Sequence, residues 1–269
     1  AFACLIAPVL AAALWSAMPP QALVTVVLAT AAYLAFWAGL ALWVGAGNGS
    51  ETAHAIRLMG LWVVLTLVLP SLAQAAISRM IPARDGVELV LAQRQLVHGA
   101  WDLPREETME RFFRHHPQWR DTPPLPAGFH WKWYYAFQQL GDEQVASQVD
   151  AYRSALLARQ RWTDRMGWLL PAVGVQVVLH RQAGTDLPAQ ISYQDRISGF
   201  HARLRAFYYP YLFNDRRLKQ ADLDARPRFQ ADAEAKFPLG LLLILMLAPV
   251  AMVILGARAT GRVNVRGEG

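Results

Sequence analysis

Histidine and cysteine are the residues of this chain best suited to hold a metal ion, and both are sparse. The seven histidines include the adjacent pair His115 and His116, with His98 and His130 in the same region, and histidine is a common zinc ligand. Adjacent side chains on a helix point about 100° apart, so such a pair cannot readily share one ion. The single cysteine, Cys4, leaves no intramolecular disulfide and no Cys-based zinc site. We therefore expect no metal site, and we expect the histidine pair to lie near the carbonyl groups at a helix end.

Motifs of common catalytic and nucleotide-binding sites are missing from the chain. No segment matches G-x-x-x-x-G-K-[ST], whose backbone amides and lysine hold nucleotide phosphates. The patterns H-E-x-x-H and G-x-S-x-G are absent as well. The chain is therefore not expected to be an enzyme or to bind a cofactor, and any ATP-driven work would need a partner subunit.

The sharpest local signal predicts a tight turn between two helices. Gly184 can end one helix in the left-handed conformation. Thr185 or Asp186 can cap the next helix, and Pro188 suits its first turn. The spacing therefore predicts helix, turn and helix around residues 184–186.

An uncharged stretch of 14 residues, 166–179, precedes this turn and is interrupted by Pro171 and Gly174. It is too short to span a bilayer, and it suits either a buried core helix or a re-entrant or interfacial segment. We favour the membrane-facing alternative because arginine and histidine residues flank the stretch. Together with the turn at 184–186, Pro171 and Gly174 form a candidate gate or structural motif.

Two segments, 129–137 and 207–213, are rich in aromatic residues. One interpretation is a lateral gate or a surface that contacts lipid or peptide just above the membrane. The other, which we favour, is a core with an interfacial belt, where Trp and Tyr keep one end apolar and one end wet. The candidate interfacial residues are Trp131, Trp133, Tyr208 and Tyr209.

The distribution of charge identifies the elements that must position these residues. Only 17% of the 269 residues are charged, against about a quarter in a typical soluble protein. Of the 46 Lys, Arg, Asp and Glu residues, 39 lie between residues 80 and 236, and none precedes Glu51. Two further charge-free runs, 58–78 and 237–257, have the length of about 20 apolar residues that crosses a bilayer. This pattern predicts an integral membrane protein and excludes a soluble enzyme.

We predict an all-α integral membrane protein with a helical extracytoplasmic domain inserted before its last span. Apolar residues recur at helical spacing through the inserted region, and its mixed charges do not form the clustered basic face that nucleic acid requires. The predicted segments are a membrane region at 1–79 with transmembrane helices at 2–18, 21–45 and 55–78, the inserted domain at 80–236, the fourth transmembrane helix at 237–257 and a cytoplasmic tail at 258–269.

Arginine residues near the ends of the predicted spans set the expected orientation. Arg258, Arg262 and Arg266 follow the last span, and Arg57 opens the third. Because Lys and Arg concentrate in short cytoplasmic segments, both of these ends are expected in the cytoplasm. The 80–236 domain then lies outside.

The predicted spans carry no ionisable residue at depth. A proton- or ion-coupled carrier keeps acids or histidines inside its helices, so the pattern argues against a secondary transporter. Ala35, Ala38 and Gly39 on the second span are small enough to permit close helix packing. These features favour spans that move as rigid bodies.

Several segments resemble one family of bacterial membrane proteins. The run LLPAVGVQVVLHRQAGTD at 169–186, Phe200 and His201 in the following helix, and DLDARPRF at 222–229 are similar to ABC transporter permeases that carry domain of unknown function 3526. The apolar runs LATAAYLAFWAGLALWV and RLMGLWVVLTLVLPSLAQ resemble the fourth and fifth spans of these permeases. The resemblance extends over nearly the whole chain.

The resemblance implies an exporter-like permease of six spans in the bacterial inner membrane, with the inserted domain on the periplasmic side. On this comparison the chain starts in span three, and the residues that couple to the ATPase would lie in the part that precedes it. The implied partners are membrane lipids, a second permease subunit in a homo- or heterodimer, and a cytoplasmic ATP-binding subunit that carries ATP and Mg. The expected function is movement of an unidentified substrate; the alternative is a membrane-anchored assembly or interaction protein whose periplasmic domain docks a partner.

Overall fold

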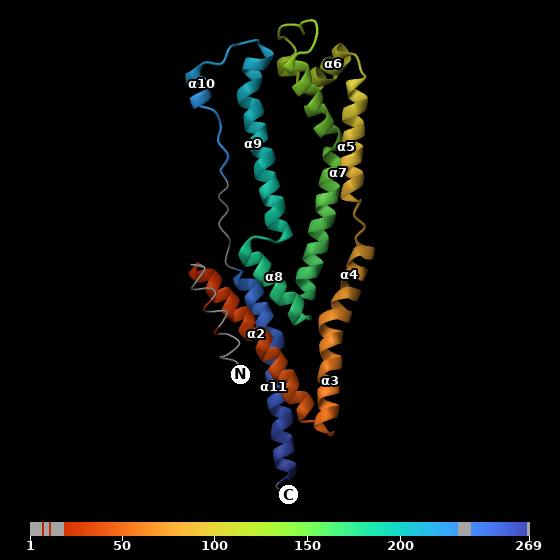
Figure 1. Ribbon diagram of the computed structural model, residues 1–269, viewed down its shortest axis with the longest axis vertical. Coiled ribbons are helices and arrows are strands. Elements are labelled where there is room, and N and C mark those ends of the chain that lie inside the picture. The colour runs from red at the N-terminus through yellow and green to blue at the C-terminus, as the bar shows by residue number, and fades with distance from the viewer. Residues whose placement is uncertain (1–6, 8–10, 12–18, 231–237, 268–269) are drawn as a thin grey trace. The chain divides into compact units, whose positions relative to one another are not determined.

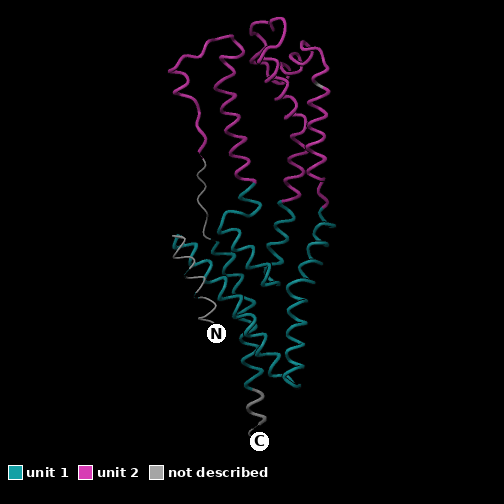
Figure 2. The backbone as a smooth tube through the Cα atoms, in the orientation of Figure 1, with its two compact units in different colours: residues 1–81, 157–190, 233–269 teal, residues 82–156, 191–232 magenta. Residues whose placement is uncertain are grey.

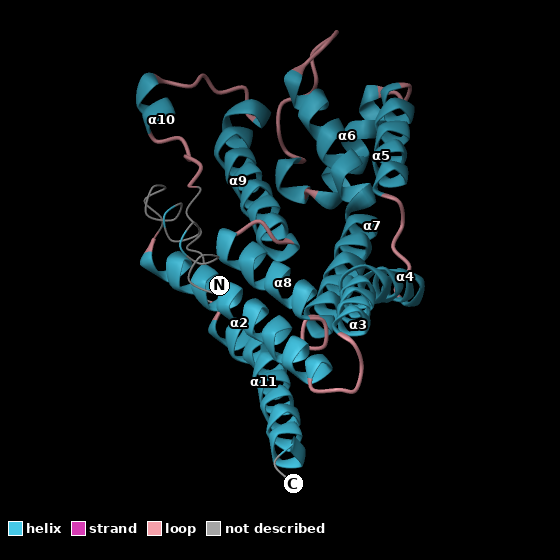
Figure 3. Cartoon of the chain, turned by 60° about the horizontal axis from the view of Figure 1, so that its bottom comes forward, coloured by secondary structure: helices cyan, strands magenta, loops and turns pink. Residues whose placement is uncertain are grey.

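The computed structural model describes residues 7, 11, 19–230 and 238–267, and every regular element in these ranges is a helix (Figures 1 and 3). The chain divides into two compact units (Figure 2). Unit 1 comprises residues 1–81, 157–190 and 233–269, and unit 2 comprises residues 82–156 and 191–232. The expected all-α class is thereby confirmed for the described residues.

Unit 1 contains three helices that are long and apolar enough to cross a membrane: Pro20–Gly45, Glu51–Met80 and Leu239–Gly261. They correspond to the spans expected at 21–45, 55–78 and 237–257, whereas the span expected at 2–18 lies outside the described residues. The helices of this unit are α2 (Pro20–Gly45), α3 (Glu51–Val63), the π-helical turn η1 (Val64–Val68), α4 (Leu69–Met80), the last part of α7 (Trp131–Met166), α8 (Pro171–Ala183), the start of α9 (Leu187–Phe213) and α11 (Leu239–Gly267). The backbone of α11 continues as a helix through most of the expected tail.

Helices α2 and α11 cross closely because glycine faces the contact on both sides. A Cβ atom added to Gly39 of α2 would lie 2.6 Å from the backbone carbon of Met252 in α11. A Cβ atom added to Gly256 would lie 2.6 Å from the backbone oxygen of Gly39. The close packing expected at Gly39 is therefore confirmed, and it depends on backbone-to-backbone approach.

Helix α8 packs against α2 and α11 within unit 1. Its Val178 is 1% exposed and contacts a buried cluster on the two candidate spans. The buried hydroxyl of Thr25 in α2 donates to Oε1 of Gln182 at 2.9 Å. This packing explains why residues 157–190 group with the spans, which differs from the continuous 80–236 domain expected from the charge pattern.

Unit 2 is built around an aromatic core. Its helices are α5 (Gly86–Trp101), α6 (Arg105–His115), the 3₁₀ turn η2 (Pro117–Trp119), the first part of α7 (Trp131–Met166), most of α9 (Leu187–Phe213) and α10 (Gln220–Asp224). Phe112 and Phe213 are fully buried, and their rings stack with centroids 5.3 Å apart. Tyr209 and Trp133 belong to the same cluster. Burial of these rings between α6, α7 and α9 is the main apolar contact of the unit.

Candidate functional site

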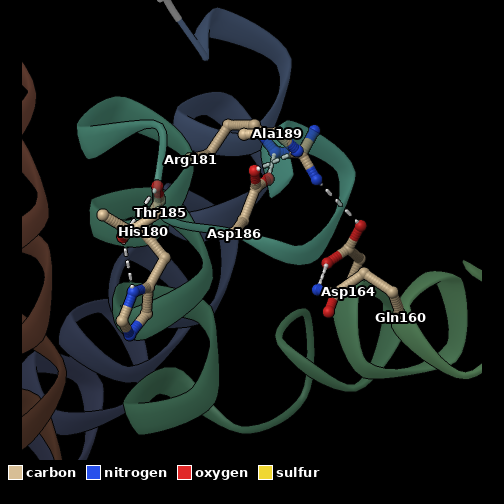
Figure 4. Close-up of polar contacts among 7 residues, drawn as sticks. All are labelled: Gln160, Asp164, His180, Arg181, Thr185, Asp186 and Ala189. Carbon is tan, nitrogen blue, oxygen red and sulfur yellow. Dashed lines mark hydrogen bonds and ion pairs between the residues drawn. The ribbon is translucent and has the colours of Figure 1, made fainter. Parts of the chain in front are cut away.

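The turn between α8 and α9 has the geometry that its residues predict (Figure 4). Gly184 adopts φ 64° and ψ 25°, the left-handed conformation, and ends α8. The amide of Thr185 donates to the carbonyl of His180 at 3.0 Å. Because a left-handed residue is strained for any side chain but favourable for glycine, this turn depends on Gly184.

Asp186 caps the next helix. Its Oδ1 accepts a hydrogen bond from the backbone amide of Ala189 at 3.0 Å. Of the two candidates, Thr185 and Asp186, it is therefore Asp186 that caps α9. The hydroxyl of Thr185 instead forms a hydrogen bond with Nδ1 of His180 at 3.0 Å (Figure 4). Both polar residues of the turn are therefore engaged, one by each flanking helix.

Arg181 joins three helices at this corner. Its Nε donates to Oδ2 of Asp186, whose side chain is only 5% exposed, and its Nη2 lies 3.3 Å from Oδ2 of Asp164 near the end of α7. Gln160 donates to the other oxygen of Asp164 at 2.7 Å (Figure 4). Two carboxylates thus satisfy one guanidinium, which ties the ends of α7 and α8 to the start of α9. We call Arg181, Asp164 and Asp186 the corner triad.

Pro171 and Gly174 set how α8 starts. The helix α7 ends at Met166, and Pro171 occupies the first position of α8. A Cβ atom added to Gly174 would lie 2.5 Å from the backbone oxygen of Gly167 and 2.9 Å from Cδ1 of Leu245. The uncharged stretch 166–179 is therefore a helix end, a tight turn and a helix start. Both Pro171 and Gly174 serve the packing of α8 on its neighbours.

His115 and His116 meet a carboxylate that the sequence analysis missed. His115 is the last residue of α6 and His116 follows it, as expected for a helix end. Their rings reach across to α7, where His115 Nδ1 and His116 Nε2 lie 3.0 and 2.8 Å from the two oxygens of Glu143. Gln139 donates to the same carboxylate at 2.8 Å. Within the described ranges no group of three metal-ligating residues is arranged to hold an ion.

Hydrogen bonding to Glu143 lowers its pKa. Partial burial alone would raise the pKa, but hydrogen bonds from His115, Gln139 and His116 outweigh it and hold the pKa below the ordinary 4.5. The folded state therefore binds this proton more weakly than the unfolded chain does. Stability from Glu143 is fully present above pH 4.5 and is lost as the pH falls through the lowered pKa.

Replacement of Glu143 by glutamine is expected to lower the free energy of unfolding at pH 7 by about 1 kcal/mol, because hydrogen bonds to a charged acceptor become neutral ones. It should also flatten the decline in stability between about pH 5 and pH 3. Thermal midpoints of the purified full-length chain between pH 3 and pH 7 measure both effects. The control is Glu107→Gln, which breaks an exposed pair with Arg111; an equal flattening in both variants would contradict the assignment.

The four aromatic candidates separate into two environments. Trp133 and Tyr209 are 5% and 6% exposed and belong to the core of unit 2. Trp131 is 55% exposed, and it lines a cavity of about 670 Å³ together with Tyr208 and Tyr209. The cavity lies between α7 and α9 within unit 2. Core packing and an open aromatic surface therefore occur together, on adjacent turns of the same two helices.

These features define an all-helical membrane protein with three candidate spans in the described part of the chain. The chain belongs to the family of domain of unknown function 3526, whose model matches residues 87–232. The matched range runs from α5 to beyond α10 and includes the corner triad and the aromatic cavity. No similar chain was found among curated proteins or among solved structures.

Proposed function

We propose that this chain is a membrane-spanning subunit of an exporter-like ABC transporter in the bacterial inner membrane, with unit 2 on the periplasmic side. The observation that carries the proposal is the construction of unit 1. Its spans have no charged side chain at depth. Two of them, α2 and α11, meet in backbone contact at Gly39 and Gly256, and Thr25 joins α2 to α8 by a hydrogen bond. Such helices suit movement as rigid bodies under an external force better than ion coupling along a path of titratable groups.

The corner triad supports this mechanical interpretation. Helix α8 packs against the candidate spans α2 and α11, and Arg181 fixes its end to the start of α9 and the end of α7. A displacement of the spans would therefore reach α7 and α9 through a joint held by ion pairs rather than by a flexible loop. Energy would come from a partner subunit that binds ATP and Mg, since this chain has no nucleotide-binding motif.

Arginine placement supports the proposed orientation. Arg57 Nη1 donates to the carbonyl of Asn48 at 3.1 Å, so its positive charge lies beside the short loop between α2 and α3. Arg258 follows the apolar part of α11. A cytoplasmic position for both is consistent with the enrichment of Lys and Arg in short cytoplasmic segments. A second permease subunit, as homo- or heterodimer, completes the proposed assembly.

Reconstitution with the proposed ATP-binding partner subunit tests the proposal. The full-length chain is placed in liposomes with that ATPase, and ATP hydrolysis is compared with that of the ATPase alone. We expect hydrolysis to respond to the permease and to lose that response when Asp186→Ala breaks the corner triad, while the two subunits still copurify. Hydrolysis that is identical with and without the permease would contradict transport and favour an anchored interaction protein.

A further inference from the structure

The aromatic cavity of unit 2 has the size and lining of a small-molecule site. Its volume of about 670 Å³ falls within the roughly 300 to 1,000 Å³ typical of ligand pockets. The lining is mainly apolar, with ring faces from Trp131 and Tyr135 on α7 and from Tyr208 on α9. Trp131 and Tyr135 are 55% and 45% exposed, so their rings are accessible from solvent. Flat apolar molecules pack well against such faces.

Two guanidinium groups line this cavity. Arg205, from α9, is partly buried, and Arg216, from the segment after α9, is exposed. Among the described residues neither forms an ion pair, unlike Arg153 of the same unit, which pairs with Asp195. Guanidinium groups favour planar anions because they can donate two parallel hydrogen bonds to them.

The remaining polar groups of the lining do not oppose an anion strongly. The single acid, Asp142, already accepts a hydrogen bond from Gln93 at 3.0 Å. Tyr209 donates its hydroxyl to Oε1 of Gln139 at 2.8 Å, and burial raises the pKa of Tyr209 to about 12. Its ring therefore stays neutral at physiological pH. The lining itself carries two arginines and one engaged carboxylate, while Glu143 and Asp222 lie close enough to act on its tyrosines Tyr209 and Tyr211.

We propose that the cavity between α7 and α9 binds a small, flat, apolar molecule that carries one carboxylate, with its rings against Trp131 and Tyr208 and its carboxylate toward Arg205 and Arg216. The site lies wholly within unit 2 and does not rest on the proposed transport function. Binding can therefore be measured without any ATPase.

Three matched probes test the charge and shape requirements. They are 2-naphthoate, neutral 2-naphthol and the cation 2-naphthylmethylammonium, titrated calorimetrically into the full-length chain in non-ionic detergent. We expect 2-naphthoate to bind with a dissociation constant of order 0.1 mM or below. It should bind about tenfold or more tightly than the neutral and cationic probes, as expected for a hydrogen-bonded charge pair.

Arginine variants assign the site. Arg205→Gln and Arg216→Gln are each expected to weaken 2-naphthoate about fivefold or more, with little change for 2-naphthol and no change in thermal midpoint. The control is Arg203→Gln, on the same helix, whose guanidinium lies over the ring of Phe200 and does not line the cavity. Equal affinity for the three probes, unaltered 2-naphthoate binding in the Arg205/Arg216 double variant, or no binding at ten times the expected constant would each overturn the proposal.

Discussion

Replacement of Asp186 by alanine is expected to lower the free energy of unfolding by about 3 kcal/mol, about 2 from the ion pair with Arg181 and about 1 from a helix cap. The Asp186 side chain is 5% exposed and faces Arg181 Nε, so alanine leaves the guanidinium with Asp164 as its one remaining carboxylate. The change also removes the acceptor for the Ala189 amide, a cap worth about 1 kcal/mol. Thermal or chemical unfolding of the purified full-length chain in detergent measures the loss.

Two further variants distinguish the contribution of the Arg181–Asp186 ion pair from that of the helix cap and from a general effect of removing a charge. Asp186→Asn keeps an oxygen that can accept the Ala189 amide, so it should lose only the ion pair, about 2 kcal/mol. Asp195→Ala breaks the pair with Arg153, in which the Asp195 side chain is 58% exposed, and should cost less than about 1 kcal/mol. Similar losses for Asp186→Ala and Asp195→Ala would show that the corner triad adds nothing beyond a surface pair.

The turn at the corner is predictable from sequence because its determinants act over very short range. Gly184 changes the backbone direction at its own position, and Asp186 captures an amide three residues later. The spans are predictable for a similar reason, since the length of an apolar run decides whether it can cross a bilayer. In both cases the physical requirement is contained within a few adjacent residues or a single helix.

Partners that lie far apart in sequence are not predictable in this way. Arg181 reaches Asp164 because of the direction in which α8 leaves the turn at 167–170, and no spacing rule supplies that direction. Glu143 meets His115 across 28 residues, after a loop whose course decides which turn of α7 faces α6. The pair of Arg181 with Asp186 is different, because these two residues lie five positions apart with opposite charge on either side of the predicted turn.

The division into units also depends on long-range packing. Residues 157–190 contain arginine residues that place them with the charged region by composition. In the structure Val178 and Gly174 of α8 fit against α2 and α11, so apolar contact decides the grouping. The number of charged residues reflects the average exposure of a whole segment. One apolar helix face within the segment is nevertheless enough to attach that segment to the membrane helices.

Replacement of Gly39 by alanine is expected to separate α2 from α11 and to cost about 2 kcal/mol or more, at the upper part of the range for overpacking. The added Cβ would lie 2.6 Å from two backbone atoms of α11, at Met252 and Val253. Backbone atoms cannot move aside as a flexible side-chain end can, so one whole helix must shift. Unfolding of the solubilised chain in increasing concentrations of SDS measures the loss.

Gly60→Ala and Gly256→Ala complete the test of this helix crossing. Gly60 lies in α3 with no heavy atom within 4 Å of an added Cβ, so alanine there should be neutral or should stabilise by about 0.5 to 1 kcal/mol through helix propensity. Gly256→Ala acts on the same contact as Gly39→Ala, because its Cβ would lie 2.6 Å from the Gly39 oxygen. Once the helices have moved apart to fit one added methyl group, the second methyl group costs less. The free energy of unfolding lost by the double variant should therefore be smaller than the sum of the two single losses. Strict additivity, or a loss at Gly60 equal to that at Gly39, would mean that the two glycines do not share one backbone contact.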